Sequence, residues 1–334
     1  MRFRACLMLC VVGSLIGPSW RFSAAQEKAV PERPKVTKAD VDKMMETLSN
    51  WGRWGKDDQL GTLNLITPAK RRAAAGLISE GVTVSLSHDA STTDQEGPPA
   101  FKREMLTLPK AEGLTFASDE FRVPYHGFTE THLDSLCHLS YNGKMYNGVT
   151  HKDVTERGAA KLSVLNFKQG IFTRCVLIDI PKLLEIRFLE AGQPIYPAHL
   201  DAWEKATNLK VEPGDVVLIR TGRWARSKVE GYDKVAKSFA GLHASCLPWL
   251  KARDVAIVGS DLALDVNPSQ VEGVEFPVHA VVLVAMGTPI LDNCDLEAVS
   301  AAAAERKRWV FAISVGPLAV PGGTGSPVNP LAIF

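Results

Sequence analysis

Short, continuous apolar runs alternate with more polar stretches through most of the chain. Runs of this kind, bounded by polar residues, are typical of strands that are buried on both faces of a sheet. They predict strands over residues 175–180, 215–220, 255–260 and 309–314. The stretches between and before them predict helices over residues 197–207, 243–251 and 295–306. An alternation of strands and helices predicts an α/β fold.

The N-terminal part of the chain is less regular. Thr37, followed by Asp40 three residues later, has the capping-box arrangement that begins a helix. A second helix is predicted over residues 68–79, because a threonine precedes it and a proline stands in its first turn. Residues 90–120 are mixed in character, and we expect long excursions there. The sequence contains no evident linker or repeat, so we predict one large domain over residues 37–334.

The first residues have the pattern of a cleaved export signal. Two arginines precede an apolar run over residues 5–17, and small residues stand just before Gln26. The run is shorter than the roughly 20 residues that a membrane helix needs. We therefore expect a signal peptide over residues 1–25, a flexible arm over residues 26–36 and a mature protein that is periplasmic or secreted.

Composition and charge narrow the class of partner. The formal net charge is +1 and no block of basic residues occurs, which argues against nucleic acid. Hydrophobic residues make up 46% of the chain, enough for a large core, and no later segment is apolar for the length of a membrane helix. The cysteines after residue 25 are widely spaced and predict core thiols: Cys137, Cys175, Cys246 and Cys294. We expect a globular protein with a small-molecule partner.

The stretch THLDSLCH, residues 131–138, gathers the residue types that bind metal ions. In an extended segment His132 and Asp134 share one face, so an imidazole nitrogen and a carboxylate oxygen can converge. That pair suits zinc, manganese or iron(II) rather than calcium. His138 would return to the same site if Ser135 began a helix, either as a third ligand or as a base. Chance clustering of histidines is the alternative, and a catalytic metal needs further ligands from elsewhere.

Several other catalytic classes lack their motifs in this sequence. There is no G-x-S-x-G elbow, no H-E-x-x-H helix and no G-x-x-x-x-G-K-[ST] loop. Their absence argues against the common serine hydrolases, the zincins and the P-loop NTPases. The segment GGTGSP near the end of the chain lacks the G-x-G-x-x-G spacing, which argues against dinucleotide binding.

The motif and several longer blocks resemble one enzyme family. THLDSLCH is similar to the T-H-x-D-x-x-x-H signature of the metal-dependent cyclase family that includes bacterial kynurenine formamidase and isatin hydrolase. The similarity extends to NWGRWGKDDQLGTLNLITP, GKMYNG, GDVVLIRTGRW, FPVHAVVLVAMG and GGTGSPVNP. The resemblance implies a single-domain cyclase-like fold of the swivelling β/β/α type, with a mixed, partly barrel-like central sheet flanked by helices. It also implies a homodimer or homotetramer.

The same resemblance implies roles for individual residues. It makes His132 and Asp134 metal ligands and His138 the general acid and base. It also expects a later histidine and, about a dozen residues beyond it, an acid, for which His279 and Asp292 are the candidates.

The sequence departs from the family pattern at two positions. Phe128 stands where the family commonly has a histidine, and Asp292 stands where it usually has a glutamate. His126 is the candidate replacement for the missing histidine, with an ordinary turn residue as its alternative. Glu130 is a further candidate ligand or supporting carboxylate. The loss at Phe128 favours one divalent ion, zinc or manganese, rather than two.

The implied activity is metal-dependent hydrolysis of an amide or of a cyclic amide or ester. A divalent ion lowers the pKa of water toward about 7 and polarises a carbonyl group. Two alternatives stay open: a non-catalytic protein that binds a metal or a small molecule on the same fold, and a metal-dependent lyase or dehydratase.

Other residues near the motifs could line a substrate pocket. The aromatic candidates can equally be core or turn residues, and the glycine-rich tail can equally be a frayed end. Asp261 follows a predicted strand, where it could be functional or could cap a helix. The substrate-binding candidates are Trp54, Trp224, Tyr146, Thr324 and Ser326.

Overall fold

A mixed, nine-stranded sheet forms the centre of the protein. The computed structural model describes residues 33–90, 92 and 101–334, so the predicted signal peptide lies outside the described residues. Across the sheet, the strands are β1 (Thr83–Ser85), β15 (Leu331–Ile333), β13 (Val310–Val315), β7 (Ile171–Asp179), β9 (Val216–Arg220), β11 (Ile257–Ser260), β12 (Ile290–Asp292), β4 (His132–Asp134) and β14 (Gly325–Pro327).

The middle of this sheet is parallel and its margins are antiparallel. β7, β9, β11 and β12 run parallel to one another, whereas β13, β15, β4 and β14 pair antiparallel with their neighbours. Every residue of β9 and β11 is buried, which explains why both strands are continuous apolar runs in the sequence. The predicted strands over residues 175–180, 215–220, 255–260 and 309–314 are all present, with β7 extended at its start.

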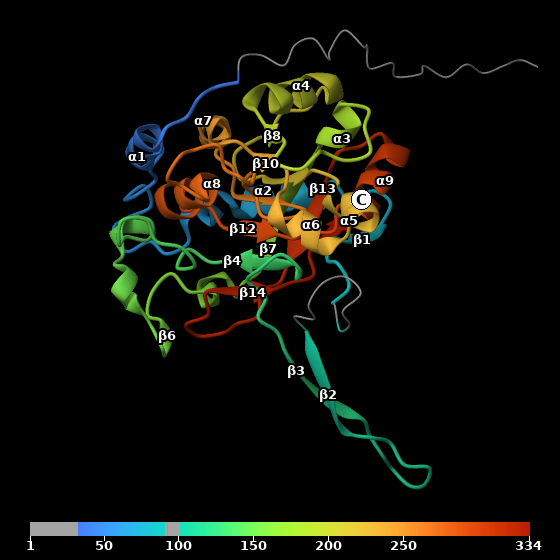
Figure 1. Cartoon of the computed structure of the whole chain (residues 1–334). Coiled ribbons are helices and arrows are strands. Elements are labelled where there is room, and N and C mark those ends of the chain that lie inside the picture. Colours follow the sequence, from blue (N-terminus) through green and yellow to red (C-terminus); the bar gives the residue numbers. More distant parts are fainter. Residues whose placement is uncertain (1–32, 91, 93–100) are drawn as a thin grey trace, which may run out of the picture.

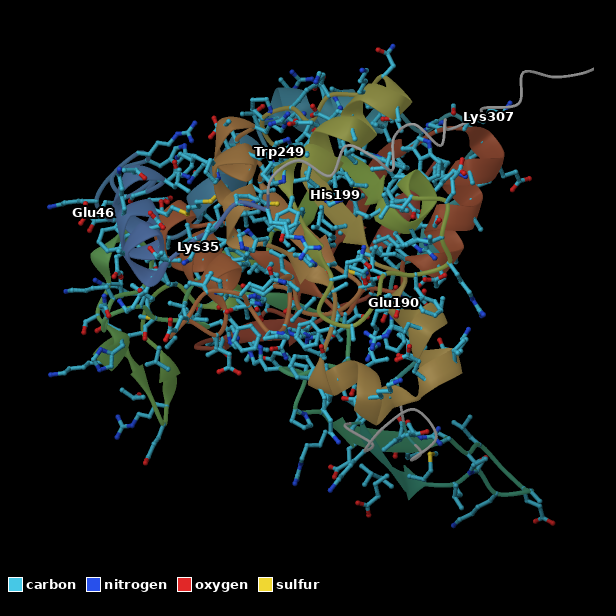
Figure 2. The ribbon with its side chains drawn as sticks, turned by 45° about the horizontal axis from the view of Figure 1, so that its top comes forward. Lys35, Glu46, Glu190, His199, Trp249 and Lys307 are labelled. Carbon is cyan, nitrogen blue, oxygen red and sulfur yellow. The ribbon has the colours of Figure 1, made fainter. Side chains whose placement is uncertain are left out.

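Helices flank the curled sheet, as Figure 1 shows, with α3, α4 and α7 grouped on the side opposite β14. Figure 2 shows Glu46 of α1 and Lys307 beyond α9 at opposite ends of the molecule. The predicted α/β class with a mixed, partly barrel-like sheet is confirmed. The α-helices are α1 (Lys38–Thr47), α2 (Pro68–Ala75), α3 (Ile180–Leu183), α4 (Pro197–Thr207), α5 (Arg223–Glu230), α6 (Tyr232–Lys237), α7 (Leu247–Ala252), α8 (Pro277–His279) and α9 (Glu297–Arg306).

Shorter elements connect these layers. Paired strands outside the main sheet are β2 (Lys102–Thr107) with β3 (Ser118–Arg122), β5 (Val154–Thr155) with β6 (Gly158–Ala159), and β8 (Pro194–Ile195) with β10 (Gly241–Leu242). A π-helix, η7 (Ala280–Met286), continues α8. The 3₁₀-helices are η2 (Gly61–Leu65), η3 (Tyr146–Gly148), η4 (His151–Asp153), η5 (Val164–Phe167) and η6 (Ala244–Cys246).

The helix predictions hold with local differences. Thr37 and Asp40 form the expected capping box of α1. The predicted helix over residues 68–79 ends earlier, at Ala75, because Gly76 is its C-cap. The segment expected to be an excursion contains the regular hairpin of β2 and β3. The four cysteines are buried free thiols, as predicted. In the described part of the chain, no helix has the length and apolar character to cross a membrane.

Two glycines hold the N-terminal segment against the end of η7. Gly61 has a φ of +58°, and a Cβ built on it would lie 1.9 Å from the carbonyl oxygen of Gly287. That carbonyl oxygen accepts a hydrogen bond of 2.9 Å from the backbone N–H of Thr62. Gly287 is the C-cap of η7 and has a φ of +63°. This close approach fixes the far end of the helical segment that begins with α8.

We predict that Gly61→Ala destabilises the protein more than Gly81→Ala. Gly81 also has a positive φ, +70°, but a Cβ there meets nothing within 4 Å. Backbone strain alone should cost about 1 kcal/mol, whereas the clash at Gly61 should add about 1–3 kcal/mol. Urea unfolding followed by tryptophan fluorescence measures both values. Equal losses in the two variants would contradict the close packing at Gly61.

Candidate metal centre

β4 brings the sequence motif into the interior. It lies between β12 and β14, with His132 opposite Asp292 and Asp134 opposite Gly325. His132 and Asp134 are 2% and 0% exposed. The Nε2 atom of His132 lies 3.5 Å from Oδ1 of Asp134, so the two side chains share one face as the two-residue spacing predicts. Leu133 points the other way and is fully buried in the core.

His138 reaches the same place through a turn. Ser135 does not begin a helix, because the backbone N–H of His138 donates to the carbonyl oxygen of Ser135 and closes a turn directly after β4. The Nε2 atom of His138 lies 3.8 Å from Oδ2 of Asp134. Its side chain is 28% exposed, which makes it more accessible than His132.

His126 joins this group from the segment that follows β3. Its Nδ1 atom lies 3.0 Å from Oδ1 of Asp134, and its ring stacks on that of His138 with centroids 3.9 Å apart. Its Nε2 atom lies 2.9 Å from Oγ1 of Thr324. Phe128, two residues later, packs instead against Phe239 in a separate apolar cluster. His126 therefore lies where it could replace the histidine that the family commonly has at the position of Phe128.

His279 and Asp292, the later histidine and acid of the family pattern, also lie close to Asp134. His279 ends α8, and its Nε2 atom lies 3.1 Å from Oδ2 of Asp292 at the end of β12. Ligand atoms of Asp134, His279 and Asp292 all lie within 4.8 Å of one another. Ligand atoms of His126, His132 and Asp134 also lie within 4.8 Å of one another. Asp134 is common to both groups, so the other four predicted ligands surround its carboxylate.

Asp265 is a functional candidate that the sequence analysis missed. It is fully buried, and its carboxylate accepts hydrogen bonds from the backbone N–H groups of Val278 and His279. Its Oδ2 atom also lies 2.6 Å from Nδ1 of His279. No spacing motif marks it, because it lies in a loop and acts on a residue 14 positions later. Its one sequence signal is a carboxylate in the region after β11.

Asp261, the residue considered in that region, has a different role. It is fully buried, and its carboxylate accepts hydrogen bonds from the backbone N–H groups of Thr221, Gly222 and Arg223. These residues form the start of α5, so Asp261 caps this helix from a neighbouring strand end. Of the two possible roles, the structure supports the cap.

Two histidines are oriented through the ring nitrogen that faces away from Asp134. Nδ1 of His132 lies 2.8 Å from the carbonyl oxygen of Glu130. A carbonyl oxygen only accepts, so Nδ1 carries the proton and Nε2 is left with a lone pair facing Asp134. Nδ1 of His279 is held by the carboxylate of Asp265, and its Nε2 atom faces Asp292. Metal-bound histidines usually have such a partner on the second nitrogen.

Three buried carboxylate oxygens in the centre lack a hydrogen-bond donor among the described residues. Both side-chain oxygens of Asp134 and Oδ1 of Asp292 are buried and accept no hydrogen bond from the described residues. Anionic oxygens in a buried place are costly unless a cation or donors compensate them. Imidazole nitrogens and carboxylate oxygens together form a donor set for a transition metal or zinc. The residues present therefore fit a divalent cation.

Electrostatics favour the ionised form of Asp134. Burial raises the pKa of Asp134, but the imidazoles of His138 and His126 outweigh it and hold that pKa well below its usual value. Burial lowers the pKa of His138, and Asp134 only partly offsets that effect. Burial also lowers the pKa of His279, but Asp292 and Asp265 outweigh it and raise that pKa well above its usual value.

One of the five substrate-binding candidates contacts the cluster. Thr324 bonds to His126 and accepts hydrogen bonds through its carbonyl oxygen from the backbone and side chain of Ser135. It precedes β14, whose pairing with β4 shows that the glycine-rich tail is held in the sheet and is not a frayed end. The neighbouring Ser326 is 1% exposed and bonds to Leu318 and Pro327 within its own segment.

The three aromatic candidates make other contacts. Trp224 is 4% exposed, and its Nε1 atom donates to the carbonyl oxygen of Cys294. Tyr146 is fully buried and its hydroxyl donates to Asp58. Burial raises the pKa of the Tyr146 hydroxyl most, and the nearby carboxylate of Asp58 raises it further. Trp54 lies under the guanidinium group of Arg53. None of these contacts of the described residues joins the three aromatic side chains to the cluster.

A separate cavity of about 760 Å³ opens between α3, α4 and α9. Its buried charged groups pair with one another, since Arg220 bonds to both Asp179 and Glu297. The cavity shares no lining residue with the histidine and aspartate cluster. The cluster is therefore the better candidate for chemistry.

Comparison with known proteins gives consistent matches. The model of the putative cyclase family matches residues 63–266. A crystal structure described as a novel cyclase is 31% identical, with a TM-score of 0.79, and the match covers 87% of this chain and 99% of that one. A search of proteins with curated descriptions gives no match.

More distant matches share the fold. Isatin hydrolase A from Labrenzia aggregata is 20% identical, with a TM-score of 0.55 over 78% of this chain and 94% of that one. Isatin hydrolase A from Ralstonia solanacearum is 21% identical, with a TM-score of 0.52 over 80% and 97%. The family model spans more than half of the chain. By sequence and by fold, this chain belongs to the putative cyclase family.

Proposed function

We propose that this protein is a metal-dependent hydrolase that cleaves an amide bond or a cyclic amide or ester. The observation that carries the proposal is the buried carboxylate of Asp134, which accepts no hydrogen bond from the described residues and lies among imidazole and carboxylate donors. Membership of the putative cyclase family supports it. The isatin hydrolases that share the fold support a cyclic amide in particular, since one was solved with the product analogue thioisatinate.

In this proposal Asp134, His132, His279 and Asp292 hold one divalent ion, and His126 completes the set. Zinc and manganese both suit these donors. Such an ion supplies Lewis acidity, which polarises a carbonyl group and makes hydroxide available near neutral pH. Asp265 and the carbonyl group of Glu130 hold the Nδ1 atoms of His279 and His132, so that Nε2 of His279 faces Asp292 and Nε2 of His132 faces Asp134.

His138 is the proposed general acid and base. It is held beside Asp134 by the turn after β4 and by its stack on His126, yet its side chain stays 28% exposed. A group in this position can take a proton from water and return it to the leaving nitrogen or oxygen. Burial lowers the pKa of His138, which keeps the imidazole in the neutral form that accepts a proton.

The reaction class can be tested directly. Purified protein loaded with zinc or manganese is incubated with N-formylkynurenine, isatin and simple lactones. Mass spectrometry then measures the molecular masses of the products. Hydrolysis adds one water to a cyclic substrate, whereas a lyase or dehydratase does not. Metal binding without turnover across the panel would favour a binding protein.

We also propose export of the mature protein, supported by the pattern of residues 1–25. Fractionation of cells that express the full chain, with N-terminal sequencing of the product, tests it.

We predict that Asp134→Asn abolishes specific metal binding. Wild-type protein should bind about one zinc or manganese ion per chain, and excess ion should raise its thermal midpoint by several degrees through linkage. The variant should lose both effects, because it lacks the carboxylate shared by all the donors. Asp57→Asn, at an exposed position, is the control. Metal analysis and thermal scans measure the outcome, and unchanged binding by Asp134→Asn would remove the proposed centre.

We predict that Asp265→Asn weakens metal binding by about 10–100-fold. The loss arises because His279 is no longer held by a carboxylate, so Asp265 acts as a positioning residue. Asp261→Asn is the matched control, since Asp261 is equally buried but caps α5. Both variants should be less stable, and competition with a chelator should separate them. An equal loss of affinity in the control would mean that general destabilisation explains the effect.

We predict that His138→Ala lowers kcat by about 10²–10⁴-fold while metal content stays near that of the wild type. The imidazole moves protons in this proposal and does not hold the ion. His151→Ala, at an exposed histidine, should leave both properties unchanged. An emptied metal site in His138→Ala would show that His138 is a ligand instead.

A further inference from the structure

The cavity of about 760 Å³ between α3, α4 and α9 has no part in the metal centre, since the two share no lining residue. The three helices are neighbours in the upper part of Figure 1. The volume is within the range of cavities that bind small organic molecules, roughly 300–1,000 Å³. The chemistry of the lining indicates which class of molecule the cavity would accept.

The buried charged groups of the lining are already satisfied by one another. Arg220 donates to Asp179 at 2.9 Å and, through Nε and Nη2, to the two carboxylate oxygens of Glu297 at 3.2 and 2.8 Å. The carboxylate of Asp179 also accepts hydrogen bonds from the hydroxyl of Ser300 and from the backbone N–H of Lys182. A ligand would gain little by placing polar groups against this network, which argues against a sugar or another polyol.

Three further cations line the cavity and form no ion pair with the described residues: Lys182, Arg187 and Lys307. Lys182 is half-buried, whereas the other two are exposed. In all, the lining has four cations and three anions: Lys182, Arg187, Arg220 and Lys307 with Asp179, Glu185 and Glu297. The cations without a partner are thus on its accessible side. They favour an anionic group over a neutral or a cationic one.

Most of the remaining lining is apolar and includes two tryptophans. The rings of Trp203 and Trp309 meet edge to face with centroids 5.0 Å apart, and Nζ of Lys182 lies 5.6 Å from the ring centroid of Trp309. Nε1 of Trp203 donates to the carbonyl oxygen of Leu177, whereas the indole N–H of Trp309 donates to none of the described residues. Smaller apolar side chains complete the wall: Pro181, Ile186, Ala206, Ala301 and Ala304.

We propose that this cavity is a binding site for a small aromatic carboxylate. The aromatic body lies against the alanines and the tryptophan rings, which prefer offset or edge-on contact with another ring. The carboxylate lies beside the ammonium groups of Lys182 and Lys307, where charge-assisted hydrogen bonds can form. The inference is independent of the proposed hydrolysis, because it concerns a cavity that shares no lining residue with the metal centre.

Isothermal titration calorimetry with 2-naphthoate tests the proposal on the metal-loaded protein. The wild type and Asp134→Asn should share one saturable binding event, because a carboxylate held by a metal at Asp134 would be lost in that variant. The neutral alcohol 2-naphthalenemethanol, which has the same rings, should bind at least about 10-fold more weakly. Absence of the shared event, or equal affinity for the neutral alcohol, would overturn the proposal.

Two sets of variants locate the binding event, and circular dichroism checks that each variant folds. Ala304→Trp fills part of the cavity and should weaken 2-naphthoate binding at least about 10-fold. Ala298→Trp, at an exposed position of the same helix outside the lining, should leave it unchanged.

Lys182→Gln with Lys307→Gln should weaken 2-naphthoate binding about 10-fold and leave the affinity for the neutral alcohol unchanged. The control pair Lys152→Gln with Lys205→Gln makes the same change in net charge at exposed positions outside the lining and should have no effect. Unchanged affinity in Lys182→Gln with Lys307→Gln, or equal losses in the variants and their controls, would overturn the assignment of the carboxylate site to this cavity.

Discussion

The buried carboxylate of Asp134 is the constraint on which the candidate site depends. It is fully buried and lies among the imidazoles of His126, His132 and His138, with a second carboxylate, Asp292, close by. Both of its oxygens lack a hydrogen-bond donor among the described residues. Two anions in so small and dry a space repel one another unless positive charge lies between them. The fold keeps them together, which is the physical reason to expect a cation.

The sheet topology produces this convergence. β4 carries His132 and Asp134 and is inserted antiparallel between β12, which ends at Asp292, and β14. Residues that are some 150 positions apart in sequence thus face one another across paired strands. The segment that carries His279 is fixed at its start by Asp265, which bonds to two backbone N–H groups of α8, and at its end by Gly287 against Gly61. Apart from His126, which lies in the irregular segment between β3 and β4, the donors are held by strands and by the start of a helical segment, which locates them more firmly than loops would.

Local pattern predicted the fold class and the pairing of His132 with Asp134, and the family resemblance added the other candidate ligands. Neither predicted the residues that support them. The two-residue spacing of His132 and Asp134 was sufficient to place both on one face, because the alternation of side chains is a property of any strand. Asp265 could not be found in this way, since its partner is set by tertiary packing. Trp224 was a candidate for the substrate pocket because large apolar side chains commonly line such sites, and Tyr146 because it follows the metal motif. Their polar atoms bond to Cys294 and Asp58. Aromatic residues next to a site can pack in the core or line the substrate pocket, and sequence does not distinguish the two roles.

Phe128 distinguishes this centre from the pattern of the resembled family. At the position where the resembled family commonly has a histidine, this chain has a ring that packs on Phe239 with centroids 5.4 Å apart. Phe276 belongs to the same apolar cluster, and its ring meets that of His279 edge-on at 5.8 Å. Apolar side chains therefore adjoin the donor set at His279. A second ion would find no imidazole at Phe128, and the proposal of a single ion rests on that difference from the family pattern.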